Sequence, residues 1–262
     1  MVYLRNQKAR VRWNGSSGDY SYVNWGVRQG GIISPLLFKL YVDDILDKIN
    51  SKNEACSFGL SRIGAIAYAD DVILLSHNLD GLRSIFRVFS DELKHRNLKI
   101  NESKTKCMIF NEKQKNVPSR LKFNNFDFEI VSSMKYLGNT ISNDLLDNED
   151  VELKLHNFYK SFHSIFRSFC NINIETFLYL FNMYCTPSYG IELWNPSIVF
   201  KKQIFKTFEI AYSSALKRIC SVPKFTSSHW IAEMSNLLLF KHYFALLQAR
   251  FFLVLSINHC LF

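Results

Sequence analysis

Apolar and polar residues alternate with the period of a β-strand in two short segments near the start of the chain, residues 9–13 and 20–25. A turn cluster lies between them, Asn-Gly-Ser-Ser-Gly at 14–18, so we predict a β-hairpin.

The glycine-bearing loop 26–35 follows, with the sequence GVRQGGIISP. Ser34 before a proline favours a helix start with Ser34 as the N-cap. Apolar residues then recur at helical spacing and predict one inward face: Leu36, Leu37, Leu40, Tyr41, Ile45 and Ile49.

The next segments are apolar runs of strand length, residues 63–69 and 72–76, which flank Asp70 and Asp71. This pattern predicts a buried hairpin that carries two carboxylates at its tip. An amphipathic helix is expected over 80–96. Further strands are expected at about 105–110, 126–131 and 135–142.

After about residue 147 the pattern becomes helical to the end of the chain. We expect helices over 148–170, 174–186, 199–219 and 228–257, the last of them broken near residue 236. The acidic stretch 143–153 is the natural boundary. The fold class is therefore predicted to be α+β, with an antiparallel sheet and packed helices in residues 1–142 and an all-helical part in residues 143–262.

The composition is that of an ordinary folded chain, with 262 residues, 48% apolar and 21% charged residues. Six cysteines match no zinc-binding spacing, and the basic, non-apolar N-terminus is no signal peptide, so we expect reduced thiols in an intracellular, nuclear or cytoplasmic protein that is not secreted. The apolar run 237–257 is interrupted by charged residues and predicts a buried amphipathic helix, with no membrane partner.

The net charge of +9 is concentrated in three basic stretches, residues 1–30, 94–122 and 201–224. Clustered basic residues suit a polyanion such as nucleic acid, although ordinary charge fluctuation on a solvated surface would give the same composition.

Asp70 and Asp71, in the segment Tyr68-Ala69-Asp70-Asp71, are the most informative residues. Adjacent carboxylates between apolar strands repel one another unless a cation compensates them. Mg²⁺ suits such hard oxygen ligands, and two Mg²⁺ ions can clamp the attacking and leaving oxygens of a phosphoryl transfer. A plain polar turn is the alternative. The second pair, Asp43 and Asp44, falls on the polar face of the 35–49 helix and is best explained as a solvated helix surface.

Two other segments offer candidate binding groups. In the loop, Gly30 and Gly31 allow close approach of another molecule, Gln29 offers a donor and an acceptor, and the helix start behind Ser34 favours an anion. A simple strand-to-helix connection remains possible. Lys104 precedes a predicted strand in the most basic region and could neutralise phosphate charge or donate a proton to a leaving group, or could be an ordinary surface lysine.

Taken in order, these segments resemble the palm of reverse transcriptases of non-LTR (LINE-type) retrotransposons, followed by the thumb and its helical extension. The resemblance runs over nearly the whole chain and is specific, because QGGIISP lies about 40 residues before YADD and YLG about 68 residues after it. The matching segments are MVYLRNQKARVRWNG, GVRQGGIISPLLFKLYVDDIL, AIAYADDVILLS, LKINESKTKCMIF, MKYLGNTIS, YCTPSYGIELWNPS and LKRICSVPKFTSSHWIAEM.

The resemblance implies an RNA-directed DNA polymerase that uses Mg²⁺, an RNA template, a DNA primer and dNTPs. It implies that Asp70 binds metal, that Asp71 supports metal or primer, and that Lys104 faces the outgoing phosphate. The residues implied to contact nucleotide or template are Arg28, Gln29, Gly30, Ser34 and Tyr68, and those implied to form the primer grip are Tyr136, Leu137 and Gly138.

The family's first polymerase motif, with a further metal-binding Asp on its own strand, has no counterpart here. Asp19 is the only acid before the loop, and it falls in a predicted turn. We therefore expect the chain to be an incomplete polymerase that is inactive alone and leaves apolar surface uncovered beside the YADD hairpin. The alternative is a non-catalytic nucleic-acid-binding remnant of such an element.

Overall fold

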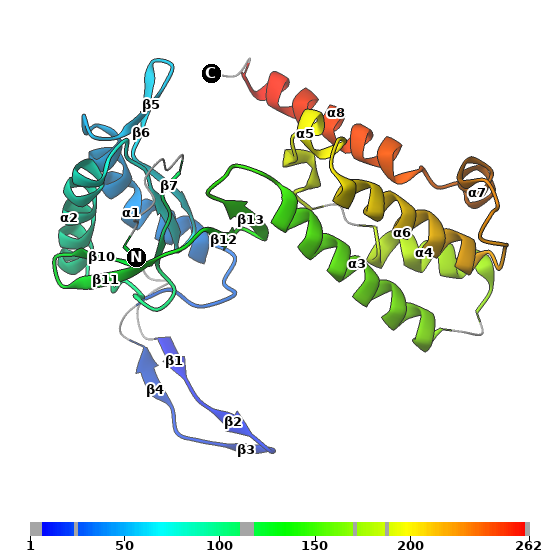
Figure 1. Cartoon of the computed structure of the whole chain (residues 1–262). Helices are drawn as coiled ribbons and strands as arrows, with labels where there is room; N and C mark the ends of the chain where they lie inside the picture. The colour runs from blue at the N-terminus through cyan, green and yellow to red at the C-terminus, as the bar shows by residue number, and fades with distance from the viewer. Residues whose placement is uncertain (1–6, 24–25, 111–117, 170–171, 187–188, 260–262) are drawn as a thin grey trace. The chain divides into compact units, whose positions relative to one another are not determined.

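The computed structural model describes residues 7–23, 26–110, 118–169, 172–186 and 189–259. The chain forms two compact units (Figure 1). The first comprises Met1–Thr105 with Arg120–Phe128, and the second comprises Lys106–Ser119 with Glu129–Phe262. These two units are defined by contacts between residues. The domain boundary expected after residue 142 rests instead on the change from strand to helix pattern in the sequence, and it stays a prediction.

The first unit begins with a two-stranded ribbon, as the alternation predicts (Figure 1). β1 (Gln7–Ala9) pairs with β4 (Ser21–Val23), and β2 (Arg12–Trp13) pairs with β3 (Ser16–Ser17), all antiparallel. Asn14 and Gly15 both have positive φ, which is the requirement of a type I′ turn. Residues 1–6 and 24–25, which the expected segments included, lie outside the described residues.

The core of the first unit lies between two helices and a hairpin. α1 (Ser34–Asn50) and α2 (Leu79–His95) pack against β7 (Ala65–Tyr68) and β8 (Asp71–Leu74). The buried apolar residues of this cluster are Val42, Ile45, Ile49, Ala65, Ile85 and Leu93. The inward face expected for α1 is correct only in its second half, because Leu36, Leu40 and Tyr41 are exposed.

The start of α1 differs from the prediction. Ile33 is the N-cap and makes no side-chain capping bond, while Ser34 is already helical with Pro35 behind it. Ser34 instead donates its hydroxyl hydrogen to the Arg28 carbonyl at 2.6 Å. By contrast, α2 has the side-chain cap expected of a stable helix start, since Asn78 Oδ1 accepts from the Gly81 N–H at 2.7 Å.

Three further small sheets complete the strand content of the described residues. A hairpin of β5 (Cys56–Phe58) and β6 (Ser61–Ile63) was not predicted, and neither was β10 (Arg120–Phe123), which pairs with β11 (Phe126–Ile130). The strand expected over 105–110 is reduced to β9 (Lys106–Cys107), parallel to the end of β11. The single strand expected over 135–142 is wrong: it is a hairpin of β12 (Ser133–Tyr136) and β13 (Asn139–Ser142).

Helices make up the rest of the second unit, as the periodicity predicts. They are α3 (Asn148–Ser168), α4 (Ile174–Tyr184), the 3-10 turn η1 (Ile191–Leu193), α5 (Pro196–Val199), α6 (Gln203–Ile219), α7 (Ser228–Ser235) and α8 (Phe240–His259). The expected break near residue 236 is confirmed, since Asn236 ends α7 with φ +52°.

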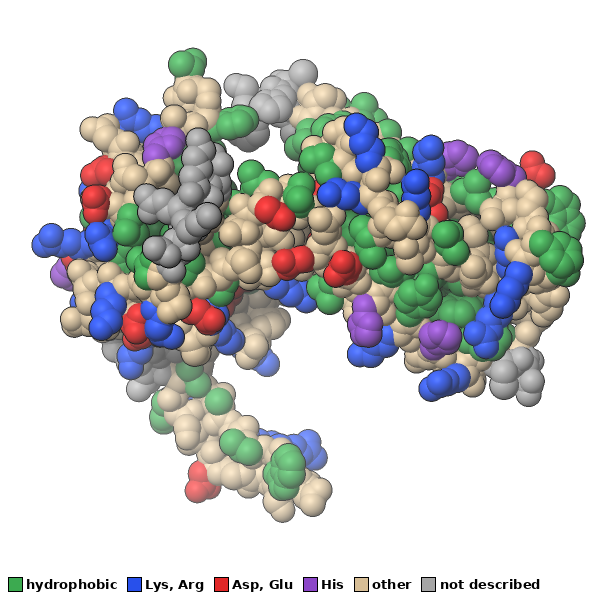
Figure 2. Space-filling view, viewed as in Figure 1, with side chains coloured by type: hydrophobic (Ala, Val, Ile, Leu, Met, Phe, Trp, Pro, Cys, Tyr) green, Lys and Arg blue, Asp and Glu red, His purple; other side chains and the backbone are tan. Residues whose placement is uncertain are grey.

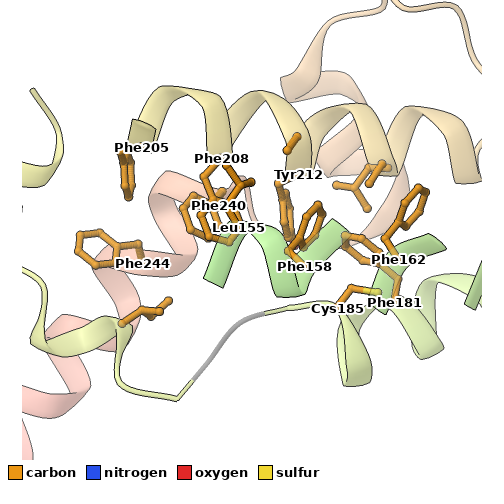
Figure 3. Close-up of a cluster of buried hydrophobic side chains, with 14 of the residues drawn as sticks. Leu155, Phe158, Phe162, Phe181, Cys185, Phe205, Phe208, Tyr212, Phe240 and Phe244 are labelled. Atoms are coloured by element: carbon orange, nitrogen blue, oxygen red, sulfur yellow. The ribbon is translucent and has the colours of Figure 1, made fainter. Parts of the chain in front are cut away.

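Aromatic side chains fill the helical core (Figure 3). Phe158 from α3, Phe181 from α4, and Phe208 and Tyr212 from α6 converge there, and Phe208 stacks on Phe240 from α8 with ring centroids 4.4 Å apart. Burying aromatic surface of this size dominates the energetics of a core. Burial also raises the pKa of the Tyr212 hydroxyl to about 12 and that of the Cys185 thiol to about 12.

The apolar run near the C-terminus is buried only in its first half. Phe240, Phe244 and Gln248 are buried, whereas residues 252–257 of α8 are exposed. Within the described parts of the chain, no single helix is long and apolar enough to cross a membrane. Only α7 and α8 together meet that criterion, and the chain bends by 61° between them.

Candidate polymerase site

The two carboxylates at 70 and 71 lie at a tight turn between β7 and β8. Tyr68 pairs with Asp71, so Ala69 and Asp70 are the two turn residues. Ala69 has φ +52°, a conformation that costs an L-residue about 1–2 kcal/mol. Backbone strain of this kind is often found where a turn must hold side chains in a set position.

The hairpin buries one face only. The cross-strand pairs Ala65–Leu74 and Ala67–Val72 alternate with the pairs Ile66–Ile73 and Tyr68–Asp71. Ala65 is buried among the helices, while Ile66 and Tyr68 are 45% and 66% exposed. The expectation of a buried hairpin is therefore correct for one face only. The face with Tyr68 and Asp71 has no covering element among the described residues, in line with the uncovered apolar surface expected beside this hairpin. Asp70 and Asp71 are both exposed.

The second aspartate pair has a different environment. Asp43 and Asp44 lie on the exposed face of α1, and Asp44 forms an ion pair with Arg96, which also pairs with Glu92. This fits the solvated helix surface predicted for the pair.

The donor chemistry at the turn suits Mg²⁺ but does not complete a metal cage. Carboxylate oxygens are the ligands Mg²⁺ prefers, and one or two of them commonly suffice when substrate phosphates supply the rest. Over the described ranges no cluster of three or more His, Cys, Asp or Glu side chains could hold a metal ion. As donors, Asp70 and Asp71 alone would therefore make only a partial Mg²⁺ site.

The glycine loop before α1 is built from two successive turns. The Gly31 N–H donates to the Arg28 carbonyl at 3.1 Å, and the Ser34 N–H donates to the Gly31 carbonyl at 3.1 Å. Gly30 has φ +76°, as the third position of a type II turn requires. A Cβ on Gly30 would meet nothing within 4 Å, whereas a Cβ on Gly31 would lie 2.6 Å from Ser34 Oγ. Arg28, Gln29 and Gly30 are thus presented on an exposed turn, while Ser34 closes it from inside.

Lys104 also belongs to the first unit. It lies in a turn anchored by Asn101, whose carbonyl accepts from the N–H groups of Lys104 and Thr105 at 3.2 and 3.0 Å. The Lys104 side chain is exposed.

The predicted primer-grip residues lie in the second unit, at the turn of the hairpin β12–β13. Tyr136 pairs with Asn139, so Leu137 and Gly138 are the two turn residues. Both have positive φ, +46° and +85°, which defines a type I′ turn. Asparagine and glycine are the usual residues there, so Leu137 is in a strained conformation.

A buried network, which the sequence reasoning missed, fixes this hairpin to the helices. Asp150 in α3 is 3% exposed; it accepts from the Thr140 N–H at 2.9 Å and from the Trp194 indole N–H at 2.7 Å, and pairs with Lys154. Lys154 also donates to Asn139 Oδ1 at 2.8 Å. The signal in the sequence was a carboxylate at a core-facing position of α3, next to Val151, inside a stretch that we had interpreted only as a boundary.

Comparison with known sequences identifies the family of the chain. The sequence model of the family described as "Reverse transcriptase (RNA-dependent DNA polymerase)" matches residues 2–141. This match and the relatives described below confirm the resemblance to reverse transcriptases of non-LTR retrotransposons that the motifs predict.

Three curated proteins are similar to parts of the chain. One is the retrovirus-related Pol polyprotein from type-1 retrotransposable element R2 of Nasonia vitripennis, 30% identical over 45% of this chain and 12% of its own length. The probable RNA-directed DNA polymerase from transposon X-element of Drosophila melanogaster is 23% identical over 73% of this chain and 22% of its own length. The R2 polyprotein of Popillia japonica is 32% identical over 23% of this chain and 10% of its own length. The chain thus spans about a tenth to a fifth of the relatives it matches.

Proposed function

Because this chain belongs to the reverse transcriptase (RNA-dependent DNA polymerase) family, we propose that it supplies part of the site of a polymerase that copies an RNA template into DNA. In this proposal residues 1–142 form part of the palm and residues 143–262 form the thumb and its extension. The observation that carries the proposal is the pair of exposed carboxylates, Asp70 and Asp71, held at a strained two-residue turn.

These two carboxylates would hold Mg²⁺ against the triphosphate of the incoming dNTP. Bound there, Mg²⁺ would neutralise phosphate charge and help to align the primer hydroxyl with the α-phosphate. Asp70 would be the direct ligand. Asp71, on the same exposed face as Tyr68, would support metal or primer.

The remaining residues would bind and orient. Arg28, Gln29 and Gly30, on the exposed turn, would contact the nascent base pair or the template, with Ser34 holding that turn closed. Lys104 would neutralise charge on the outgoing phosphate. Leu137 and Gly138 would contact the primer with Tyr136, and the network around Asp150 would fix their position.

We further propose that the chain alone does not extend primers, since a two-metal site needs a carboxylate from a further strand. That gap also favours the second candidate function, a remnant that binds nucleic acid without catalysis. The two candidates share the same family and differ in activity.

Metal binding tests the partial site directly. Mn²⁺ can replace Mg²⁺ in a titration followed by electron paramagnetic resonance, which measures the free ion. We expect the wild-type chain to bind Mn²⁺ weakly and Asp70→Asn/Asp71→Asn to lose that binding. The matched control is Asp43→Asn/Asp44→Asn, which removes the same charge from the helix surface and should bind as the wild type does. Equal loss in both variants would refute a specific site at the turn.

Primer extension tests activity. We expect no extension of a DNA primer on an RNA template by the purified chain in Mg²⁺. Extension that disappears in Asp70→Ala/Asp71→Ala would show a complete site and contradict the proposed inactivity.

Binding of a primer–template as a function of salt tests the nucleic-acid-binding function. The logarithm of the binding constant should fall with the logarithm of the salt concentration, because phosphate contacts release counterions. A binding constant that is insensitive to salt would argue against phosphate-led contact.

A further inference from the structure

The ribbon β1–β4 carries a row of cations and aromatic rings that the polymerase site does not use. Lys8 lies over the Tyr22 ring, with Nζ 5.0 Å from the ring centroid, and Arg10 lies over the Tyr20 ring at 5.0 Å. Lys8 and Tyr22 are direct cross-strand partners, so the two pairs follow one another along the same face of the ribbon. Arg12 follows two residues after Arg10 and extends the row.

This surface is open to solvent over its whole length. Every residue from 8 to 23 is exposed, and Tyr20 and Tyr22 are 60% and 61% exposed. In the space-filling view, the ribbon carries hydrophobic and basic side chains on the face that is drawn (Figure 2). The described ribbon holds three basic residues and a single acid, Asp19. Exposed apolar patches that are rimmed by polar residues commonly mark interaction sites.

We propose that this face, formed by Lys8, Arg10, Arg12, Tyr20 and Tyr22, binds single-stranded nucleic acid. Its cations would contact phosphates, and its tyrosine and guanidinium planes would stack with bases, the combination by which proteins hold single strands without reading their sequence. The inference rests on the proposed function and deepens it, because it assigns a surface for the unpaired template to a chain expected to bind nucleic acid.

Charge and ring geometry together favour a single strand over other partners. A duplex offers phosphates but keeps its base faces stacked inside, so it would use the cations and leave both tyrosines without a role. A protein partner would favour the apolar side chains Val11 and Trp13, which are 76% and 77% exposed. Because side chains alternate between the two faces of a strand, we expect them on the face opposite the cations. In a single strand each base is attached to a phosphate, so each tyrosine could stack on a base while its neighbouring cation contacts the phosphate.

The test is fluorescence anisotropy with a short labelled RNA of mixed sequence, the DNA strand of the same sequence, and the RNA–DNA duplex. Lys8→Ser/Arg10→Ser should weaken RNA binding at least about tenfold in low salt. It should also reduce the slope of log binding constant against log salt concentration by about 1.4, because each of the two lost phosphate contacts contributes about 0.7. Tyr20→Ser/Tyr22→Ser should weaken it about tenfold or more with the slope unchanged, because stacking releases no counterions.

Controls separate this face from general charge and hydrophobicity. Arg87→Ser/Lys94→Ser removes two exposed cations from α2 of the same unit, and Trp13→Ser removes an exposed ring from the opposite face. Both should bind RNA within about twofold of wild type. Because all substituted side chains are exposed, the variants should unfold at the wild-type urea concentration.

Three outcomes would overturn the assignment. Wild-type affinity in both ribbon variants would refute it while leaving the proposed function intact, since binding would then lie elsewhere on the chain. Duplex binding as tight as single-strand binding, with no loss in the tyrosine variant, would refute base stacking. If both ribbon variants bind RNA as the wild type does and Trp13→Ser loses self-association, the ribbon is a protein-docking surface. If the ribbon variants lose affinity equally for the RNA strand and the DNA strand, the face binds single strands of either kind. If they lose affinity for RNA alone, the face is specific for the RNA template.

Discussion

The Trp194 indole donates a hydrogen bond to the Asp150 carboxylate at 2.7 Å, although 44 residues separate them. The same carboxylate accepts from the Thr140 backbone N–H at 2.9 Å and pairs with Lys154, whose side chain is largely buried. Gln248 from α8 donates to the Trp194 carbonyl at 2.7 Å. One buried carboxylate therefore links the hairpin β12–β13, α3 and the segment before α5, and α8 supports that segment.

Removing this carboxylate should cost far more than removing an exposed one. We expect Asp150→Ala to lower the free energy of unfolding by about 3–5 kcal/mol, because it leaves the Lys154 charge buried and unpaired. Trp194→Phe removes one hydrogen bond to a charged group and should cost about 1.5–3 kcal/mol. Urea denaturation followed by circular dichroism measures both.

The control for this comparison is Glu149→Ala, one residue away on the exposed side of α3. It should change the free energy of unfolding by less than about 0.5 kcal/mol, as substitutions at exposed sites usually do. If Asp150→Ala were no more destabilising than Glu149→Ala, the network would be energetically unimportant.

Two glycines with the same backbone conformation should respond very differently to alanine. Gly190 has φ +79°, and a Cβ there would lie 1.8 Å from Asn139 Oδ1, displacing the amide that accepts from Lys154. Gly15 has φ +81° and open space around it. We expect Gly15→Ala to cost about 1–2 kcal/mol from the backbone alone, and Gly190→Ala to cost about 2–5 kcal/mol through the added loss of the Lys154 contact. Thermal unfolding of Gly15→Ala and Gly190→Ala measures both costs. Equal losses of stability would mean that the structure around residue 190 shifts to make room for the added methyl group.

The local patterns in the sequence predicted most elements, and the failures have physical reasons. The turn Asn14-Gly15 and the pair Asp70-Asp71 carry recognisable turn chemistry, and both hairpins were found. Leu137 gives no such signal, because leucine is a poor residue for positive φ, so one strand was predicted where two strands turn back on each other.

Burial was harder to predict than secondary structure. The apolar runs on either side of Asp70 and Asp71 predict a buried hairpin, yet Ile66 is exposed, because periodicity cannot tell which neighbours a strand has. Similarly, Asp150 lies in a stretch of five acids, and only its place beside the apolar Val151 distinguishes it from the exposed Glu149. The candidate site residues could be found from motif order, whereas the network that positions them could not.

Glu92 should make the stability of the first unit sensitive to acid. Hydrogen bonds from Lys48 and Arg96 lower its pKa from the ordinary 4.5 to about 2. A carboxyl whose folded-state pKa is depressed contributes stability above its ordinary pKa, and that contribution is lost as the pH falls through the folded-state value. We therefore expect stability to fall between about pH 4.5 and pH 2, and Glu92→Gln to fall less steeply there than wild type. Urea midpoints measured across this range test it, with Glu102→Gln as control; parallel curves for Glu92→Gln and wild type would contradict the assignment.

Leu137 should show opposite effects on stability and on primer binding. Asparagine tolerates positive φ better than leucine, so Leu137→Asn should raise the free energy of unfolding by about 1 kcal/mol. If Leu137 contacts the primer as proposed, the same substitution should weaken primer–template binding in an anisotropy titration. Leu145→Asn is the matched control, because Leu145 has φ +58° in an exposed loop of the same unit. Leu145→Asn should gain similar stability by relieving the same backbone strain. It should not weaken primer–template binding, because Leu145 lies outside the proposed primer grip. Unchanged binding in Leu137→Asn would remove the turn from the primer grip.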